Sequence, residues 1–266
     1  MASFTAGQKI HYTLRIAIAM CFIGHGAFGL ITKEIWTHYF AVFGIGREMA
    51  YKLMPILGIV DISLGILMLV RPARAIAGWL VIWGLVTAAL RPLSGEPFAE
   101  LVERAGNFGA PLAFLLLCDG TSALNNLVTG KNWWKRVPPE ETGHLQQVGI
   151  CLRIAGFLLL IGHGWLNLIG KKGLIDQYTA LGFTNPHQIA LWAGIFEVAT
   201  AASLLVRPWR SLLFLLIIWK MGTELFYPHY ELFEWVERGG SYGVLLALWF
   251  ITKERAPRPN YLSLAT

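Results

Sequence analysis

Apolar and polar positions fall in long blocks along the chain. Eight blocks are continuous apolar runs of about 20 residues, the length that a helix needs to cross about 30 Å of hydrocarbon. They cover residues 12–32, 50–70, 74–93, 103–125, 150–170, 187–206, 209–227 and 238–252. The strands of a membrane barrel would instead alternate apolar and polar positions. The pattern therefore predicts an all-α fold with eight membrane-spanning helices.

The second half of the chain repeats phrases of the first half. Ile23-Gly24-His25-Gly26 returns as Ile161-Gly162-His163-Gly164, and Leu69-Val70-Arg71-Pro72 returns at nearly the same spacing as Leu205-Val206-Arg207-Pro208. Self-similarity at one period indicates a duplicated structural unit. We predict two tandem four-helix bundles, residues 1–124 and 148–266, related by an internal repeat of about 136 residues and joined by a cytoplasmic linker, residues 125–147.

The composition indicates an integral membrane protein. Of the 266 residues, 55% are hydrophobic and only 14% are charged, with a mean hydropathy of +0.54. A single soluble domain cannot bury so much apolar surface. The first apolar run lacks a small-x-small cleavage pattern, so we expect it to remain as a helix. The three cysteines form no Cys-x-x-Cys pair, which disfavours disulfide exchange.

The charged residues predict the orientation. With the N-terminus inside, the inner side holds 13 of the 22 Lys and Arg residues, whereas most acidic residues fall in the outer segments. The positive-inside rule then places both termini in the cytoplasm, for a multi-pass protein of the inner (cytoplasmic) membrane. The net charge of +6 reflects this topology, and no basic stripe indicates a nucleic-acid partner.

Ionisable residues inside the apolar runs are the candidate ligand-binding or proton-handling groups. Their spacing from the cytoplasmic ends places His25 and Asp61 at similar depth in the outer half, and His163 and Glu197 repeat that geometry. In each half a Glu-Arg pair, Glu103–Arg104 or Glu237–Arg238, enters the membrane from the outer side. We expect the His-carboxylate pair and the Glu-Arg pair of each half to face the interior of their own bundle. The primary candidates are His25, Asp61, Glu103, Arg104, His163, Glu197, Glu237 and Arg238.

Five more side chains are secondary candidates because they lie on the third run of each half or at its outer end. They are Trp83, Arg91, Trp219, Lys220 and Glu224. No residue is assigned a catalytic role, and whether the chain is an enzyme is left open. The glycines that flank each histidine have a separate expected task, which is to allow close packing between helices.

The buried ionisable groups have a structural and a functional interpretation. In the structural one, the His-carboxylate pairs tie helices together through hydrogen bonds. In the functional one, a histidine beside a carboxylate exchanges protons with a bound quinone or a transported solute. A haem or metal bound by His25 and His163 is a further alternative, but neither histidine has a second histidine three or four residues away. No metal ligands are assigned.

Four features mark the four-run unit: Arg15 opens the first run, a glycine-rich stretch surrounds His25, Asp61 lies in the second run and Arg74 is at the start of the third. With these features the unit resembles the DoxX-like family of small membrane proteins. The resemblance covers most of both halves. It implies four-helix units and association with membrane redox systems, including quinone-linked sulfur oxidation in some members. The fused pair departs from the family's usual single unit.

Together these observations favour an accessory or cofactor-handling membrane subunit, expected in a quinone-linked redox system. The expected cofactor is a quinone, with haem or a metal as alternatives. The expected partners are the lipid bilayer and another membrane or periplasmic redox subunit. A small-solute transporter and an assembly helper without a ligand remain alternatives, because parallel repeats also occur in transporters.

Overall fold

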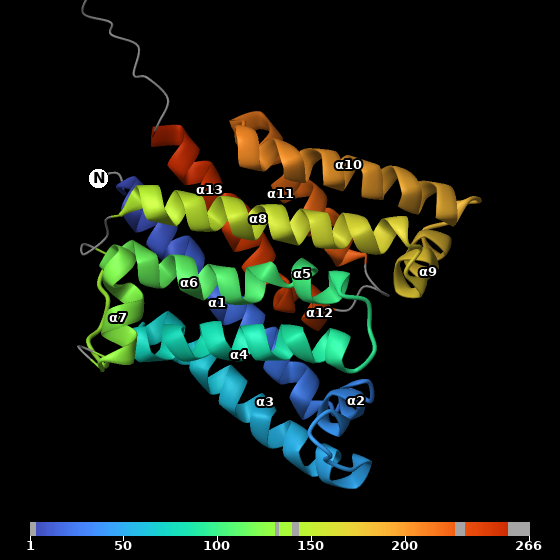
Figure 1. Cartoon of the computed structure of the whole chain (residues 1–266), viewed down its shortest axis with the longest axis horizontal. Coiled ribbons are helices and arrows are strands. Elements are labelled where there is room, and N and C mark those ends of the chain that lie inside the picture. The colour runs from blue at the N-terminus through green and yellow to red at the C-terminus, as the bar shows by residue number, and fades with distance from the viewer. Residues whose placement is uncertain (1–3, 131–132, 140–143, 227–231, 255–266) are drawn as a thin grey trace, which may run out of the picture.

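Helices make up nearly all of the structure, a computed structural model that describes residues 4–130, 133–139, 144–226 and 232–254 (Figure 1). The first half contains α1 (Ala6–Leu30), α2 (Trp36–Ala41), α3 (Arg47–Val70), α4 (Arg74–Leu93), α5 (Ala99–Glu103), α6 (Ala105–Asp119), the 3-10 turn η1 (Gly120–Ser122) and α7 (Ala123–Val128). The second half contains α8 (Leu145–Leu168), α9 (Lys172–Ala180), α10 (Pro186–Val206), α11 (Arg210–Leu225), α12 (Leu232–Glu237) and α13 (Gly239–Glu254). The predicted all-α fold class is confirmed.

Five helices of the described chain are long and apolar enough to cross a membrane: α1, α3, α4, α8 and α10. Residues 105–119 of α6 and 239–252 of α13 form shorter apolar helices, and α11 has 16 residues. The predicted run 103–125 is interrupted at both ends. Arg104 separates α5 from α6, and Gly120, with φ +57°, ends α6. A membrane protein is therefore supported, while the count of eight spans stays a prediction.

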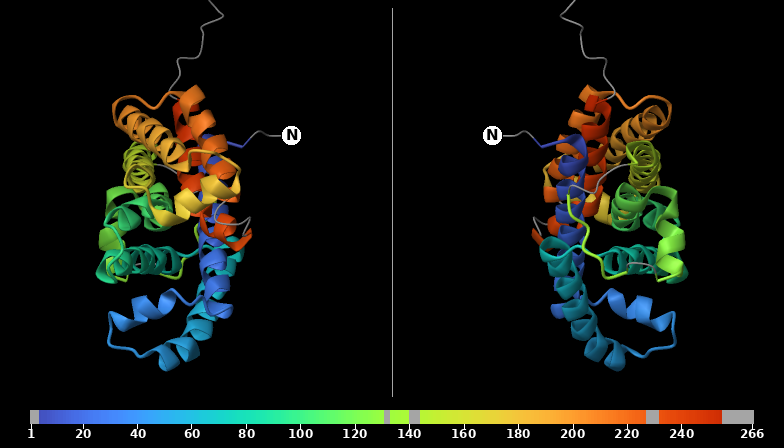
Figure 2. Two further views of the ribbon diagram at one scale, coloured as in Figure 1. Left: turned by 90° about the vertical axis from the view of Figure 1, so that its right-hand side faces the viewer. Right: turned by 90° about the vertical axis from the view of Figure 1, so that its left-hand side faces the viewer.

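The first helix of each half packs against both halves of the chain. α1 contacts α3 and α6 of its own half, and also α12 and α13 of the second half. α8 correspondingly contacts α10 and α13, and also α5 and α6 of the first half. α6 and α13 meet at the centre, where a Cβ on Gly106 would lie 2.6 Å from the Ser241 nitrogen. Helices of the two halves lie side by side (Figure 2), and their buried side chains form one shared core rather than two separate bundles.

Glycines bring α1 and α3 into backbone contact beside His25. A Cβ on Gly58 would lie 2.5 Å from the carbonyl oxygen of Gly26, and a Cβ on Gly26 would lie equally close to the carbonyl oxygen of Gly58. In the second half, Gly164 and Gly194 approach one another in the same way. The predicted packing role of these glycines is therefore confirmed.

We expect Gly58→Ala to lower the free energy of unfolding by about 1–3 kcal/mol, because a backbone carbonyl cannot move aside as a flexible side chain could. Gly222→Ala in α11 is the matched control. A Cβ there meets no atom within 4 Å, so helix propensity should raise stability by roughly 0.5–1 kcal/mol. Unfolding titrations in detergent would compare the two variants, and equal stabilities would contradict the close α1–α3 contact.

Arginines near the start of α1 and α8 bind the ends of the neighbouring helices. Arg15 Nε donates to the carbonyl oxygen of Met68 at 3.1 Å, and Arg153 Nε donates to that of Leu204 at the same distance. Both acceptors lie in the last turn of a helix, where carbonyl groups lack intrahelical partners and a cation is favoured. The sequence pattern gave no indication of this contact of Arg15.

The start of α1, the end of α13 and α7 lie toward one end of the bundle in Figure 1, and α2, α5 and α9 lie toward the opposite end. Part of the linker packs on the core, because the Val137 nitrogen donates to the carbonyl oxygen of Pro72 at 3.0 Å. Linker residues 131–132 and 140–143 lie outside the described residues. Most of the buried charged side chains lie toward the end that holds α2 and α5, whereas Arg74 is buried beside Asp119 at the end of α6.

Candidate functional site

The first predicted pair, His25 and Asp61, is formed where α1 crosses α3. His25 Nδ1 lies 2.7 Å from Asp61 Oδ2, and Asp61 is only 2% exposed. The close glycine contact between the two helices sets this distance. The His25 ring lies against Trp36 of α2, with ring centroids 4.6 Å apart. With Nδ1 engaged by Asp61, Nε2 is the free nitrogen of the ring for any further partner.

The second predicted pair, His163 and Glu197, belongs to a longer chain of hydrogen bonds. His163 Nδ1 lies 2.5 Å from Glu197 Oε2, and the other carboxylate oxygen accepts from Trp219 Nε1 at 3.0 Å. Asn167 Nδ2 lies 3.2 Å from His163 Nδ1, and the Tyr178 hydroxyl donates to Asn167 Oδ1 at 2.8 Å. Every member of this chain of side chains thus has a protein partner.

Asp61 is one methylene shorter than Glu197, and this changes the surroundings of His25. Trp83 occupies the position in the first half that Trp219 occupies in the second, but its Nε1 is buried without a described hydrogen-bond acceptor. The Trp83 indole instead stacks on Trp79, with centroids 6.1 Å apart and planes at 9°. A buried indole N–H normally has a partner. The Trp83 N–H beside His25 is therefore available to a ligand, whereas the Trp219 N–H beside His163 already donates to Glu197.

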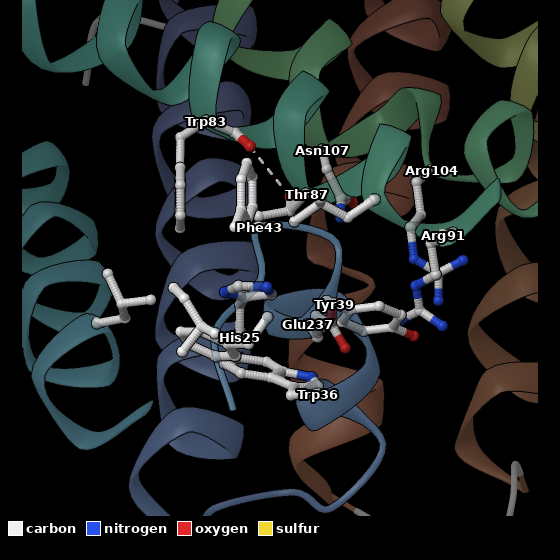
Figure 3. A pocket seen from close by; sticks show the side chains of 14 residues that line it. His25, Trp36, Tyr39, Phe43, Trp83, Thr87, Arg91, Arg104, Asn107 and Glu237 are labelled. Carbon is white, nitrogen blue, oxygen red and sulfur yellow. Dashed lines mark hydrogen bonds between the residues drawn. The ribbon is translucent and has the colours of Figure 1, made fainter. Parts of the chain in front are cut away.

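A cavity of about 230 Å³ lies beside His25 (Figure 3). Most of its wall is aromatic or aliphatic, and Arg91 and Arg104 lie together on the side away from Trp83. The lining residues are His25, Trp36, Tyr39, Phe40, Phe43, Ile45, Leu57, Trp83, Thr87, Leu90, Arg91, Arg104, Asn107 and Glu237. Two polar groups of this wall, the Asn107 amide and the Glu237 carboxylate, are at least nine-tenths buried and make no side-chain hydrogen bond to a described residue.

The corresponding space beside His163 is filled by two charged side chains of α11. The cavity there measures only about 10 Å³. Lys220, with 0% exposure, lies 2.7 Å from Glu224, and His163 Nε2 lies 4.0 Å from the same carboxylate. The corresponding residues of the first half are Gly84 and Ala88, which have no polar side chains. The two His-carboxylate pairs are thus similar, but the pair at His25 lies beside a much larger cavity than the pair at His163.

The Glu-Arg pairs are shared between the halves, so the expectation that each pair faces its own bundle is wrong for the glutamates. Glu237 lines the cavity at His25, and Glu103 lines the small cavity at His163. Arg104 and Arg238 do stay with the histidine of their own half. Each glutamate reaches the histidine of the other half because α12 crosses α1 and α5 crosses α8. A Cβ on Gly24 would lie 2.4 Å from the Glu237 nitrogen, and Gly162 meets Glu103 in the same way.

Glu103 and Glu100 are the centres of a buried network of ion pairs between the two sites. Glu103 accepts from Arg104 at 2.7 Å and from Arg238 of the second half. Glu100 accepts from Arg104 at 2.6 Å and forms an ion pair with Lys171, which follows α8. Burial alone would raise the pKa of the Glu100 carboxyl, but Arg104 and Lys171 lower that pKa to about 2. Glu100 therefore stays charged at neutral pH, and the network ties the halves together.

A second, more polar cavity of about 250 Å³ adjoins the first at the α2 and α5 end. The two cavities share Trp36, Arg91, Arg104 and Glu237. Lys33 of this cavity pairs with Glu234, and Arg91 lies 3.2 Å from Glu96. We call this second cavity the vestibule. Glu237 stands where the apolar cavity and the vestibule meet.

The site also contains one group with the side chains of a metal centre. Ligand atoms of Glu103, His163 and Glu224 lie within 4.8 Å of one another, and all three residues are buried. Their carboxylates already face Lys220 and Arg238, which lie 2.7 and 3.6 Å from Glu224. A divalent cation would add positive charge beside both, so this arrangement favours ion pairs over a metal.

The sequence interpretation missed several members of the site. Trp36 and Tyr39 lie in the cavity wall but were not among the candidates. Asn107 follows the Glu-Arg pair by one helical turn, and could have been found by that spacing. Lys171 and Tyr178 carried no such signal, because only the tertiary packing brings α9 to these groups.

Comparisons of the chain with known protein families, with curated proteins and with solved structures find no match. The resemblance to the DoxX-like family therefore stays a prediction. The function has to be argued from the site itself.

Proposed function

We propose that the chain is an accessory or cofactor-handling subunit of a quinone-linked redox system in the membrane, and that it binds the quinone head group in the cavity beside His25. The observation that carries this proposal is the set of unpaired polar groups in an otherwise apolar wall. Trp83 Nε1, the Asn107 amide and the Glu237 carboxylate lack described partners, and His25 has a second ring nitrogen. Buried polar groups without partners favour a ligand that supplies them.

The chemistry of a quinone fits these groups. Its flat ring suits an aromatic wall such as Trp36, and its two carbonyl oxygens accept from N–H donors such as Trp83 and Asn107. The reduced form carries two hydroxyl groups, which donate to His25 or to Glu237. The volume of about 230 Å³ lies below the roughly 300–1,000 Å³ of drug-sized sites, so one ring rather than a large cofactor is the expected occupant.

The His25–Asp61 pair is suited to receive a proton from such a hydroxyl group. The buried Asp61 carboxylate orients the ring through Nδ1 and stabilises the imidazolium that forms when Nε2 takes the proton. Glu237 stands next to this histidine at the entrance to the polar vestibule. The pair therefore supplies proton handling, while the electrons would pass to a membrane or periplasmic redox partner.

The packing of the opposite end of the bundle favours binding over transport. Beyond His25, toward the termini, α1 contributes Leu14, Ile18 and Phe22, and each is at most 2% exposed. These side chains belong to one continuous core with Leu80 and Phe114. The site thus has a polar route on one side only, as a binding site requires, whereas a transporter alternates between two sides.

The same proposal includes eight spans in two parallel repeats, with both termini in the cytoplasm. The shorter helices α6, α11 and α13 complete the eight spans, and Arg71, Arg74, Arg207 and Arg210 lie at the termini end of the bundle. Under the positive-inside rule that end is cytoplasmic. The vestibule then opens toward the outer side of the inner membrane.

A matched pair of tryptophan variants tests the proposed function. We expect the protein in lipid nanodiscs to bind one quinone per chain, and Trp83→Phe to weaken that binding about fivefold through loss of one hydrogen bond worth about 1 kcal/mol. Trp219→Phe removes the donor to Glu197 and should leave quinone affinity unchanged. Equilibrium titration and quinone extraction measure both. Failure to find saturable quinone binding to the wild-type protein would contradict the proposal.

A further inference from the structure

The cavity beside His25 reaches the gap between α3 and α4. These helices are joined by the short turn at residues 71–73, yet α3 packs mainly against α1 and meets α4 only sparsely. Figure 1 shows α3 diverging from α4 beyond the turn, with α2 at the wider end. The cavity wall includes Leu57 of α3 and both Trp83 and Leu90 of α4. The cavity is therefore bounded by both helices where they separate.

Lipid-facing side chains surround this opening. On α3, Ile56 and Ile59 flank Leu57 and are 57% and 58% exposed. On α4, Trp79 and Ile82 lie four residues and one residue before Trp83 and are 48% and 53% exposed. Such surfaces of a membrane helix face hydrocarbon. The cavity residues at this gap are apolar or aromatic, whereas Figure 3 shows the charged groups of Arg91 and Arg104 on the side away from Trp83, so polarity falls toward the gap.

The corresponding gap in the second half is bridged. Phe196 of α10 packs edge-on against Trp219 of α11, with ring centroids 5.2 Å apart, and Glu197 accepts the Trp219 N–H. The residue that corresponds to Phe196 in the first half is Val60, which is 43% exposed and has no ring with which to reach Trp83. Because the first half has Val60 in place of a phenylalanine, no aromatic contact with Trp83 closes the α3–α4 gap at this position.

We infer that the ligand enters sideways from the bilayer between α3 and α4, and that its apolar chain stays in this gap over Leu57. This inference rests on the proposed quinone site and adds that the physiological ligand carries a long apolar chain. Each buried methylene favours the membrane by about 0.8 kcal/mol, so a long-chain quinone is concentrated in the hydrocarbon beside the gap. A quinone without a chain is soluble in water and also reaches the site through the vestibule.

The test closes the gap with the residue that closes it in the second half. Association rates of a long-chain and a chain-less quinone are measured by stopped-flow fluorescence for Val60→Phe in nanodiscs. We expect the long-chain rate to fall at least tenfold and the chain-less rate to change less than twofold. Ile195→Phe is the control, because Ile195 of α10 is the exposed second-half counterpart of Ile59 and lies away from the cavity, and it should change neither rate. Leu57→Trp, which narrows the opening from inside, should also lower the long-chain rate if Val60→Phe folds poorly.

Two results would overturn the inference in different ways. Unchanged long-chain rates in both Val60→Phe and Leu57→Trp, with quinone binding intact, would overturn lateral entry and leave the proposed function in place. No binding of either quinone to the wild-type protein would overturn the proposed function and the lateral route together.

Discussion

Glu103→Leu is expected to lower the free energy of unfolding by about 3–5 kcal/mol, because removing one partner of a buried ion pair leaves the remaining charge without compensation in a medium of low polarity. Glu103 is 2% exposed and holds Arg104 of its own half and Arg238 of the other half. Both arginines lose their shared carboxylate. Steric trapping or titration with a denaturing detergent would measure the loss.

An exposed ion pair gives the control for this variant. Glu48 pairs with Lys52 at 2.6 Å on α3, but both side chains are more than half exposed. Glu48→Ala should therefore change the stability by less than about 1 kcal/mol. If Glu103→Leu proved as mild as Glu48→Ala, the contacts between the halves would not depend on this network.

The sequence predicted the helices well because lipid imposes a simple requirement on them. A helix that satisfies its own backbone hydrogen bonds in hydrocarbon needs a long apolar run, and such runs can be recognised without knowing the fold. The predicted run 74–93 coincides with α4, and 187–206 differs from α10 by one residue. α1 starts earlier than predicted because Thr5 and Gln8 form a capping box ahead of the apolar run.

The His-carboxylate pair within each half was also predictable, whereas the position of Glu237 and Glu103 beside the histidine of the other half was not. His25 and Asp61 lie on consecutive long helices, and their depths follow from residue counts alone. The position of Glu237 beside His25 depends on the crossing of α1 by α12, which lie near opposite ends of the chain, and the sequence carries no local signal for it. Gly24 is the residue that permits this crossing, and its sequence context identified only close packing in general.

The difference between the two sites could be seen in the sequence only in retrospect. Asp61 against Glu197 and Val60 against Phe196 look like ordinary divergence at matching positions of the two halves. Only the hydrogen bond from Trp219 to Glu197 and the missing acceptor at Trp83 show what one methylene changes. The expectation of two similar sites therefore gives way to one open cavity and one filled counterpart.

Lys220→Met is the second variant with a large expected effect, about 3–5 kcal/mol of lost stability, because it removes one partner of a buried ion pair. Lys220 is fully buried and lies 2.7 Å from Glu224, so the single change leaves that carboxylate without its nearest cation. The double variant Lys220→Met with Glu224→Leu removes both charges and fills the space with apolar side chains. Its stability should return to within about 1 kcal/mol of the wild type.

The double-mutant cycle on these two residues separates a structural role of the second site from a functional one. If the filled site only supports the fold, the double variant keeps its stability and also its quinone affinity, because the cavity at His25 lies outside the pair. Retained stability with lost quinone affinity would show instead that Lys220 and Glu224 act on the ligand site through Arg238 and Glu103. The first outcome is expected, since Glu103 still holds both arginines when the pair is removed.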